Sequence, residues 1–131
     1  MKEIDLKKFL EICKNDFEFN HHIRYWTGSY KIGFGDKVYL ILFKDGKISG
    51  LKDKIEKFDY PTCWTLASIE TWEEMLKPIP KPGYNSFRAA MFYHGLELSQ
   101  GYSVIQFPML NRFLVLLRKY YNTEILGANN G

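Results

Sequence analysis

The spacing of apolar side chains changes along the first half of the chain, and the change separates predicted helices from predicted strands. Residues 3–15 place apolar side chains three to four positions apart, which predicts an amphipathic helix, and residues 17–23 follow as a second short helix. Apolar and polar positions then alternate. That period of two predicts a strand over residues 27–34, a continuous apolar run predicts a second over residues 37–43, and residues 47–51 are expected to form the strand that returns beside it.

Two details of these strands indicate how they pair. Asp45-Gly46 lies between the second and third strands, and this dipeptide favours a two-residue type I′ turn, which needs positive φ at both positions. The stretch from Val38 to Phe43 is apolar on both faces, which predicts a central strand covered on both sides. We therefore expect residues 37–43 to form a central strand that pairs with residues 47–51 in an antiparallel hairpin.

The second half of the chain alternates helices with short strands. Ser68 is placed to cap a helix, and the prolines between residues 78 and 82 exclude helix from the loop that follows. The expected elements are strands over residues 62–66 and 96–100 and helices over residues 69–76, 85–93 and 109–121. This order predicts an α+β fold, a five-stranded and mainly antiparallel sheet covered by helices. In this interpretation residues 1–122 form one domain and residues 123–131 a flexible tail.

Composition and charge narrow the classes of function. Of the 131 residues, 46% are apolar, 17% aromatic and 25% charged, and the formal net charge is +3. These values describe an ordinary globular domain, and scattered lysines without a charged run argue against nucleic acid as a partner. Cys13 and Cys63 are too few and too distant for a disulfide framework, so we expect two reduced thiols. A charged N-terminus and the lack of a long apolar run predict a cytoplasmic protein.

Several short motifs follow one another in an informative order. They are Arg24-Tyr25-Trp26 at the entry to the first strand, the Asp45-Gly46 hairpin, Thr65-Leu66 before Ser68, the proline-containing segment from Trp72 to Tyr84, the strand between Gly95 and Gly101, and the apolar helix from Leu110 to Leu117. Together they resemble the sterol carrier protein family, in particular its small bacterial and archaeal single-domain members, over about residues 19–121. The resemblance implies a lipid-transfer fold with an apolar cavity. One departure is Tyr102, where many relatives have Asp or Asn.

Apolar side chains in the second half of the chain form the main candidate binding site. Its members are Trp72, Met75, Leu76, Phe87, Met91, Phe107, Leu110, Phe113, Leu114 and Leu117. The resemblance implies that they line a cavity for fatty acyl chains, sterols or similar lipids. Burial of apolar surface contributes about 25 cal/mol per Å², so an acyl chain can bind there without a specific polar contact. The alternative is a filled core, and the residues alone leave both interpretations open.

Polar chemistry is sparse in this sequence. Arg24 and Tyr25 form the second candidate site, because a guanidinium beside a phenol can bind the carboxylate or phosphate of a head group. The alternative is structural, with Arg24 paired to a surface acid. His21 and His22 are adjacent and point to different sides, so we expect neither a metal ion nor another cofactor.

These observations favour a module that binds or transfers an apolar small molecule, such as a fatty acid, a fatty acyl-CoA or a sterol-like lipid. Transient membrane contact is compatible with that role, and the oligomeric state is left open, a homodimer included. The alternative is a small cavity enzyme of the polyketide-cyclase kind, with isomerase or cyclase chemistry by general acid–base action on an apolar substrate. Its candidate groups are Asp59, Tyr60, His94 and Glu97. No hydrolase, phosphate-loop or zinc-protease motif is present, so catalysis has little support.

Overall fold

The chain forms helices and strands in nearly the order that its sequence predicts. The computed structural model describes residues 1–99 and 106–127, with side chains in the second range from residue 108 onward. The elements are α1 (Leu6–Lys14), α2 (Phe17–Ile23), β1 (Gly28–Phe34), β2 (Lys37–Lys44), β3 (Lys47–Lys52), β4 (Cys63–Ala67), α3 (Ile69–Met75), α4 (Phe87–His94), β5 (Glu97–Leu98), α5 (Gln106–Tyr120) and the π-helical turn η1 (Tyr121–Ile125). The predicted α+β fold is confirmed.

The five strands form one sheet in the order β3-β2-β1-β4-β5, with β1 at its centre. Three of the four strand pairs are antiparallel, and β1 pairs with β4 in parallel, so the sheet is mainly antiparallel as predicted. The hairpin between β2 and β3 turns at Asp45 and Gly46, whose φ angles are 49° and 78°. Both values are positive, which confirms the predicted turn type.

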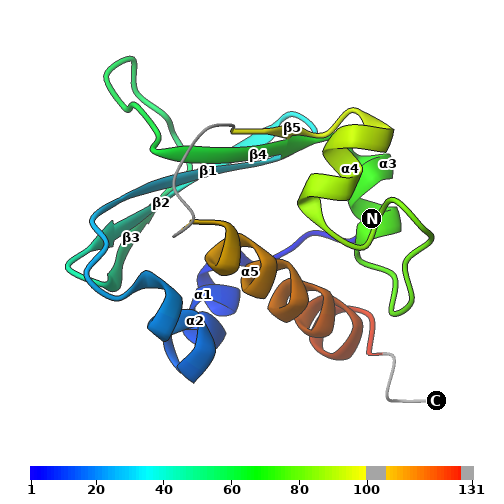
Figure 1. The fold of residues 1–131 in the computed structure, drawn as a ribbon, viewed down its shortest axis with the longest axis horizontal. Helices are drawn as coiled ribbons and strands as arrows, with labels where there is room; N and C mark the ends of the chain where they lie inside the picture. Colours follow the sequence, from blue (N-terminus) through cyan, green and yellow to red (C-terminus); the bar gives the residue numbers. More distant parts are fainter. Residues whose placement is uncertain (100–105, 128–131) are drawn as a thin grey trace.

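The helices lie on one side of the sheet (Figure 1). α1, α2 and α5 pack beneath the strands, and α3 and α4 stand at the end of the sheet near β5. Tyr30, Ile32 and Ile41 point to the helices and are fully buried. Within the described residues no helix covers the opposite face of the sheet. On that face of β2 Leu40 is buried and Val38 and Leu42 are half-buried, so the second face is partly covered without a helix.

Capping residues explain where most helices begin. Asp5, Asp16, Ser68 and Ser86 each accept a hydrogen bond from the backbone N–H three residues later, at the starts of α1, α2, α3 and α4. Such caps satisfy backbone donors that a helix leaves unpaired at its start. α4 ends at Gly95, whose φ of 72° suits a glycine C-cap.

The last helix differs from its prediction at both ends. α5 begins at Gln106 rather than at residue 109, so Pro108 occupies the first turn, where a missing N–H costs nothing. At its other end α5 continues into η1, so residues 123–125 of the predicted tail belong to a helical turn. The rest of that segment from residue 128 on, and Tyr102, lie outside the described residues.

Candidate functional site

The structure brings the predicted apolar set together from α3, α4 and α5. Its buried members share one hydrophobic cluster: Trp72, Met75, Leu76, Phe87, Leu110, Phe113, Leu114 and Leu117. Met91 is half-buried and packs against the same cluster, whereas the side chain of Phe107 lies outside the described part of the chain. The lining of a cavity by these residues stays a prediction, because their side chains pack against one another and against the sheet.

Trp72 joins α3 to the sheet. Its indole Nε1–H donates a hydrogen bond of 2.8 Å to the backbone oxygen of Gly33 in β1. The indole ring packs on Phe34 with ring centroids 4.5 Å apart and meets the edge of Phe87 of α4 at 5.7 Å. A buried indole needs such a partner for its N–H, so this contact positions α3 and α4 on the end of β1.

α5 closes the same interior from below. Phe113 packs at right angles to the rings of Phe9 and Tyr30, with centroids 5.1 and 5.3 Å apart. Near the other end of the helix, Arg118 Nε donates to the backbone oxygen of Met75 at 2.8 Å. This bond satisfies a carbonyl that the end of α3 leaves unpaired. α5 therefore contacts the sheet at its middle and α3 near its C-terminal end.

Two buried hydroxyl groups interrupt the apolar interior. Tyr30 of β1 and Thr65 of β4 are both fully buried, and neither Tyr30 Oη nor Thr65 Oγ1 has a hydrogen-bond partner. Burial raises the pKa of Tyr30 well above its usual value, and the nearby Thr65 hydroxyl offsets a part of that rise. Neither residue belongs to the candidate site predicted from the sequence. Their signal was a hydroxyl side chain at inward-facing positions of otherwise apolar strands.

The second candidate site lies on the surface. Arg24 is exposed, and its Nη1 lies 2.7 Å from His21 Nε2 and donates to the His21 backbone oxygen at 2.7 Å. Tyr25 is 90% exposed with a φ of 68°. A pocket of about 340 Å³ is lined by His21, His22, Arg24, Tyr25 and Pro108. The partner of Arg24 is therefore a histidine, not the surface acid that the structural alternative expected.

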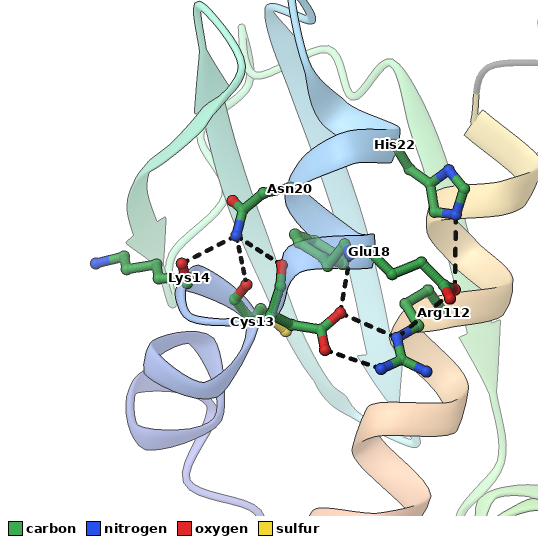
Figure 2. A network of polar contacts seen from close by, with 8 residues as sticks. Cys13, Lys14, Glu18, Asn20, His22 and Arg112 are labelled. Carbon is green, nitrogen blue, oxygen red and sulfur yellow. Dashed lines mark hydrogen bonds and ion pairs between the residues drawn. The ribbon is translucent and has the colours of Figure 1, made fainter.

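A polar network joins α2 to α5 (Figure 2). Arg112 of α5 donates from Nε and Nη2 to the two carboxylate oxygens of Asp16, at 2.9 and 2.8 Å. These bonds hold the pKa of Asp16 below its usual value. Glu18 lies 3.6 Å from both Arg112 and His22. Nothing in the sequence pattern pointed to this pairing, because its residues lie in different helices far apart along the chain.

The candidate catalytic groups have their contacts in separate places. Asp59 pairs with Lys52 at 2.6 Å, and Tyr60 is 80% exposed on the loop between β3 and β4. His94 stacks on Tyr84 with centroids 3.7 Å apart at the end of α4. In the part of the chain that the structure describes, no three His, Cys, Asp or Glu side chains gather as metal ligands. No helix among the described residues is both long and apolar enough to cross a bilayer.

The sheet order, the helices on one face and the apolar interior between them define the fold of sterol carrier domains. No family model and no curated protein sequence matches the chain. Among solved structures, a "sterol carrier protein 2" superimposes with a TM-score of 0.62 at 16% identity, covering 86% of this chain and 92% of that chain. The "sterol carrier protein domain 2 of Helicoverpa armigera" gives 0.53 at 16%, covering 84% and 86%. A "UbiJ-SCP2 Ubiquinone synthesis protein" gives 0.52 at 9%, covering 85% and 87%. At these identities the likeness shows the fold.

Proposed function

We propose that the protein binds an apolar small molecule, such as a fatty acyl or sterol-like lipid, between the sheet and the helices and transfers it. The observation that carries the proposal is the continuous apolar interior formed by α3, α4 and α5 against β1 and β4 in a sterol carrier fold. A buried CH₂ group contributes about 0.8 kcal/mol, so ten of them contribute about 8 kcal/mol without any polar contact.

α5 is the element whose displacement would admit a ligand. It contributes Leu110, Phe113, Leu114 and Leu117 to the interior, and its inner face meets the sheet through side chains alone. Its fixed polar contacts lie at the sides, where Arg112 binds Asp16 and Arg118 binds Met75. If α5 moved outward between these two contacts, its inner side chains would pack against the ligand instead of the sheet. Few hydrogen bonds would break.

The surface pocket at Arg24 is proposed as the place for a charged head group, when the ligand has one. Arg24 uses Nη1 toward His21 and leaves the rest of its guanidinium exposed. Guanidinium groups bind carboxylates and phosphates in a bidentate manner. Arg24→Gln should then weaken binding of dodecanoate more than binding of a ligand without charge.

Thermal unfolding with dodecanoate and with 1-dodecanol tests the proposal. At a free ligand concentration one hundred times Kd, the stabilisation is about 2.7 kcal/mol. For 131 residues this raises Tm by about 10 °C. Native mass spectrometry of the purified protein should also show a bound apolar molecule. Protein that is always recovered empty, with a Tm that no apolar ligand changes, would contradict the proposal.

A pair of variants on one helix localises the site. Leu114 of α5 is 2% exposed and faces the interior, whereas its neighbour Val115 is 47% exposed. Leu114→Trp should fill the interior and weaken binding, and Val115→Trp should leave it unchanged. Leu117→Ala creates space and should strengthen binding of longer chains. Equal affinities in all three variants, each checked for folding by circular dichroism, would place the ligand elsewhere.

A further inference from the structure

Two hydroxyl groups on the inner face of the sheet are buried without partners, and this is rare in folded proteins. Tyr30 and Thr65 are 0% exposed, and no donor or acceptor satisfies Tyr30 Oη or Thr65 Oγ1. One other buried side-chain atom in the described residues has no hydrogen bond, Glu74 Oε2, and Lys81 Nζ lies 3.8 Å from it. Among the described residues, the hydroxyls of Tyr30 and Thr65 are therefore the two buried side-chain groups with neither a hydrogen-bond partner nor an ion-pair partner.

The register of the sheet places the two hydroxyls together. β1 and β4 are parallel neighbours in which Tyr30 is opposite Cys63 and Ile32 is opposite Thr65. Tyr30 and Thr65 are thus diagonal neighbours on the face that meets the helices. The Thr65 hydroxyl lies close enough to Tyr30 Oη to lower the pKa of Tyr30 in part, but their contact does not meet the geometry of a hydrogen bond. A single oxygen atom that contacts both hydroxyls would give each of them a full hydrogen bond.

The surroundings of the pair are apolar and carry no charge. Phe113 presents its ring edge-on to Tyr30, with centroids 5.3 Å apart, and Leu98 of β5 is opposite Thr65. The thiol of Cys63, opposite Tyr30 in β4, is also buried, and burial raises its pKa to about 12. An anion placed here would lose its hydration and gain no cation, so the site favours a neutral group.

We infer that Tyr30 and Thr65 form a polar subsite inside the apolar interior, which takes the single hydroxyl or carbonyl oxygen of a neutral apolar molecule. An alcohol donates to one side chain and accepts from the other, and a carbonyl oxygen accepts from both, since each hydroxyl both donates and accepts. The inference rests on the proposed function, because it names the class of ligand that the interior prefers. The subsite should favour neutral alcohols and ketones over fatty-acid anions.

Three probes of one chain length test the subsite: 1-dodecanol, dodecane and dodecanoate, each titrated while the intrinsic tryptophan fluorescence of the protein is recorded. Dodecanol should bind about 5–10-fold more tightly than expected from the burial of its hydrocarbon chain, for which dodecane is the reference. This is the effect of one or two neutral hydrogen bonds. Tyr30→Phe and Thr65→Val should remove this excess and leave the affinity for dodecane unchanged. Thr65→Ser keeps a hydroxyl and should retain it.

The stability of the variants is a second measurement. If the two hydroxyls had a structural role, their removal would lower the stability of the protein. Tyr30→Phe and Thr65→Val delete an unpaired hydroxyl, so both variants should unfold at the same or a higher urea concentration than the parent protein. Tyr39→Phe, on the neighbouring strand and half-buried, is the matched control and should change neither affinity nor stability. A clear loss of stability in Tyr30→Phe would mean that the hydroxyl is paired.

The outcomes separate the two proposals. If none of the three probes binds, the proposed function fails and the subsite fails with it. If all three bind but Tyr30→Phe and Thr65→Val bind dodecanol as tightly as the parent protein, the function stands and the subsite is refuted. Tighter binding of dodecanoate than of dodecanol in the parent protein, lost in Arg24→Gln, would assign the polar end of the ligand to the surface pocket instead.

Discussion

The bidentate contact between Asp16 and Arg112 should make a measurable contribution to stability, because it joins α2 to α5 and also caps a helix. Asp16 accepts two hydrogen bonds from Arg112 and a third from the backbone N–H of Phe19. Asparagine caps a helix about as well as aspartate, so Asp16→Asn removes the charge and keeps the cap. Asp16→Ala removes both. The pair of variants therefore separates the ion pair from the cap.

The burial of the two side chains sets the expected size of the effect. Asp16 is 16% exposed and Arg112 27%, which lies between the surface and the buried cases. Exposed ion pairs contribute about 0–1 kcal/mol, and breaking a buried pair costs about 3–5 kcal/mol. We expect about 1–2 kcal/mol for Asp16→Asn, and about 1 kcal/mol more for Asp16→Ala. For 131 residues these values lower Tm by about 4–7 °C and 7–11 °C.

The contribution of Asp16 to stability should depend on pH in a predictable direction. Its pKa in the folded protein lies below the ordinary value of 3.8, chiefly because of the hydrogen bond from Arg112. A group with a lowered folded pKa stabilises the protein above its unfolded pKa and loses that effect as the pH falls through the folded value. The Tm difference between the parent protein and Asp16→Asn should be constant between about pH 5 and 8 and shrink below about pH 4.

Scanning calorimetry on the parent protein, Asp16→Asn, Arg112→Gln and the double variant measures the coupling directly. A coupling energy near 1–2 kcal/mol is expected, since each single variant removes the same contact. Glu18 lies 3.6 Å from Arg112, so Glu18→Gln is the control and should cost about 0.5 kcal/mol or less. Zero coupling in the cycle, or a Tm difference that grows on acidification, would refute the reasoning.

Three further changes have outcomes that follow from single contacts. Trp72→Phe removes the donor to the Gly33 oxygen and should cost about 2 kcal/mol in urea unfolding; no loss would mean the carbonyl finds another partner. Gly46→Ala places a Cβ 2.8 Å from a backbone nitrogen, whereas Gly95→Ala meets nothing within 4 Å, so the first should destabilise clearly more than the second, which costs about 1 kcal/mol through its positive φ. Burial raises the pKa of Cys63 to about 12, so the folded protein should react with Ellman's reagent at pH 8 far more slowly than the unfolded chain, and equal rates would contradict this burial.

Local pattern determined a large part of this fold. Alternating apolar positions predicted β1, a continuous apolar run predicted β2, and the Asp45-Gly46 dipeptide predicted the hairpin between β2 and β3, because side-chain pattern and turn chemistry act over a few residues. The cap at Ser68 marked the start of α3 for the same reason. The apolar set of the candidate site was also readable, since helical spacing places such side chains on one buried face.

Other features were decided only by the tertiary structure. The parallel pairing of β1 with β4, the packing of the helices on one face of the sheet and the contact between Asp16 and Arg112, 96 positions apart, depend on which distant segments meet. The unpaired hydroxyls of Tyr30 and Thr65 belong to the same class. The sequence by itself determined which side chains face inward, because that follows from local periodicity. Which of them meet, and which polar atoms are left without partners, followed from packing between segments that the local pattern does not relate.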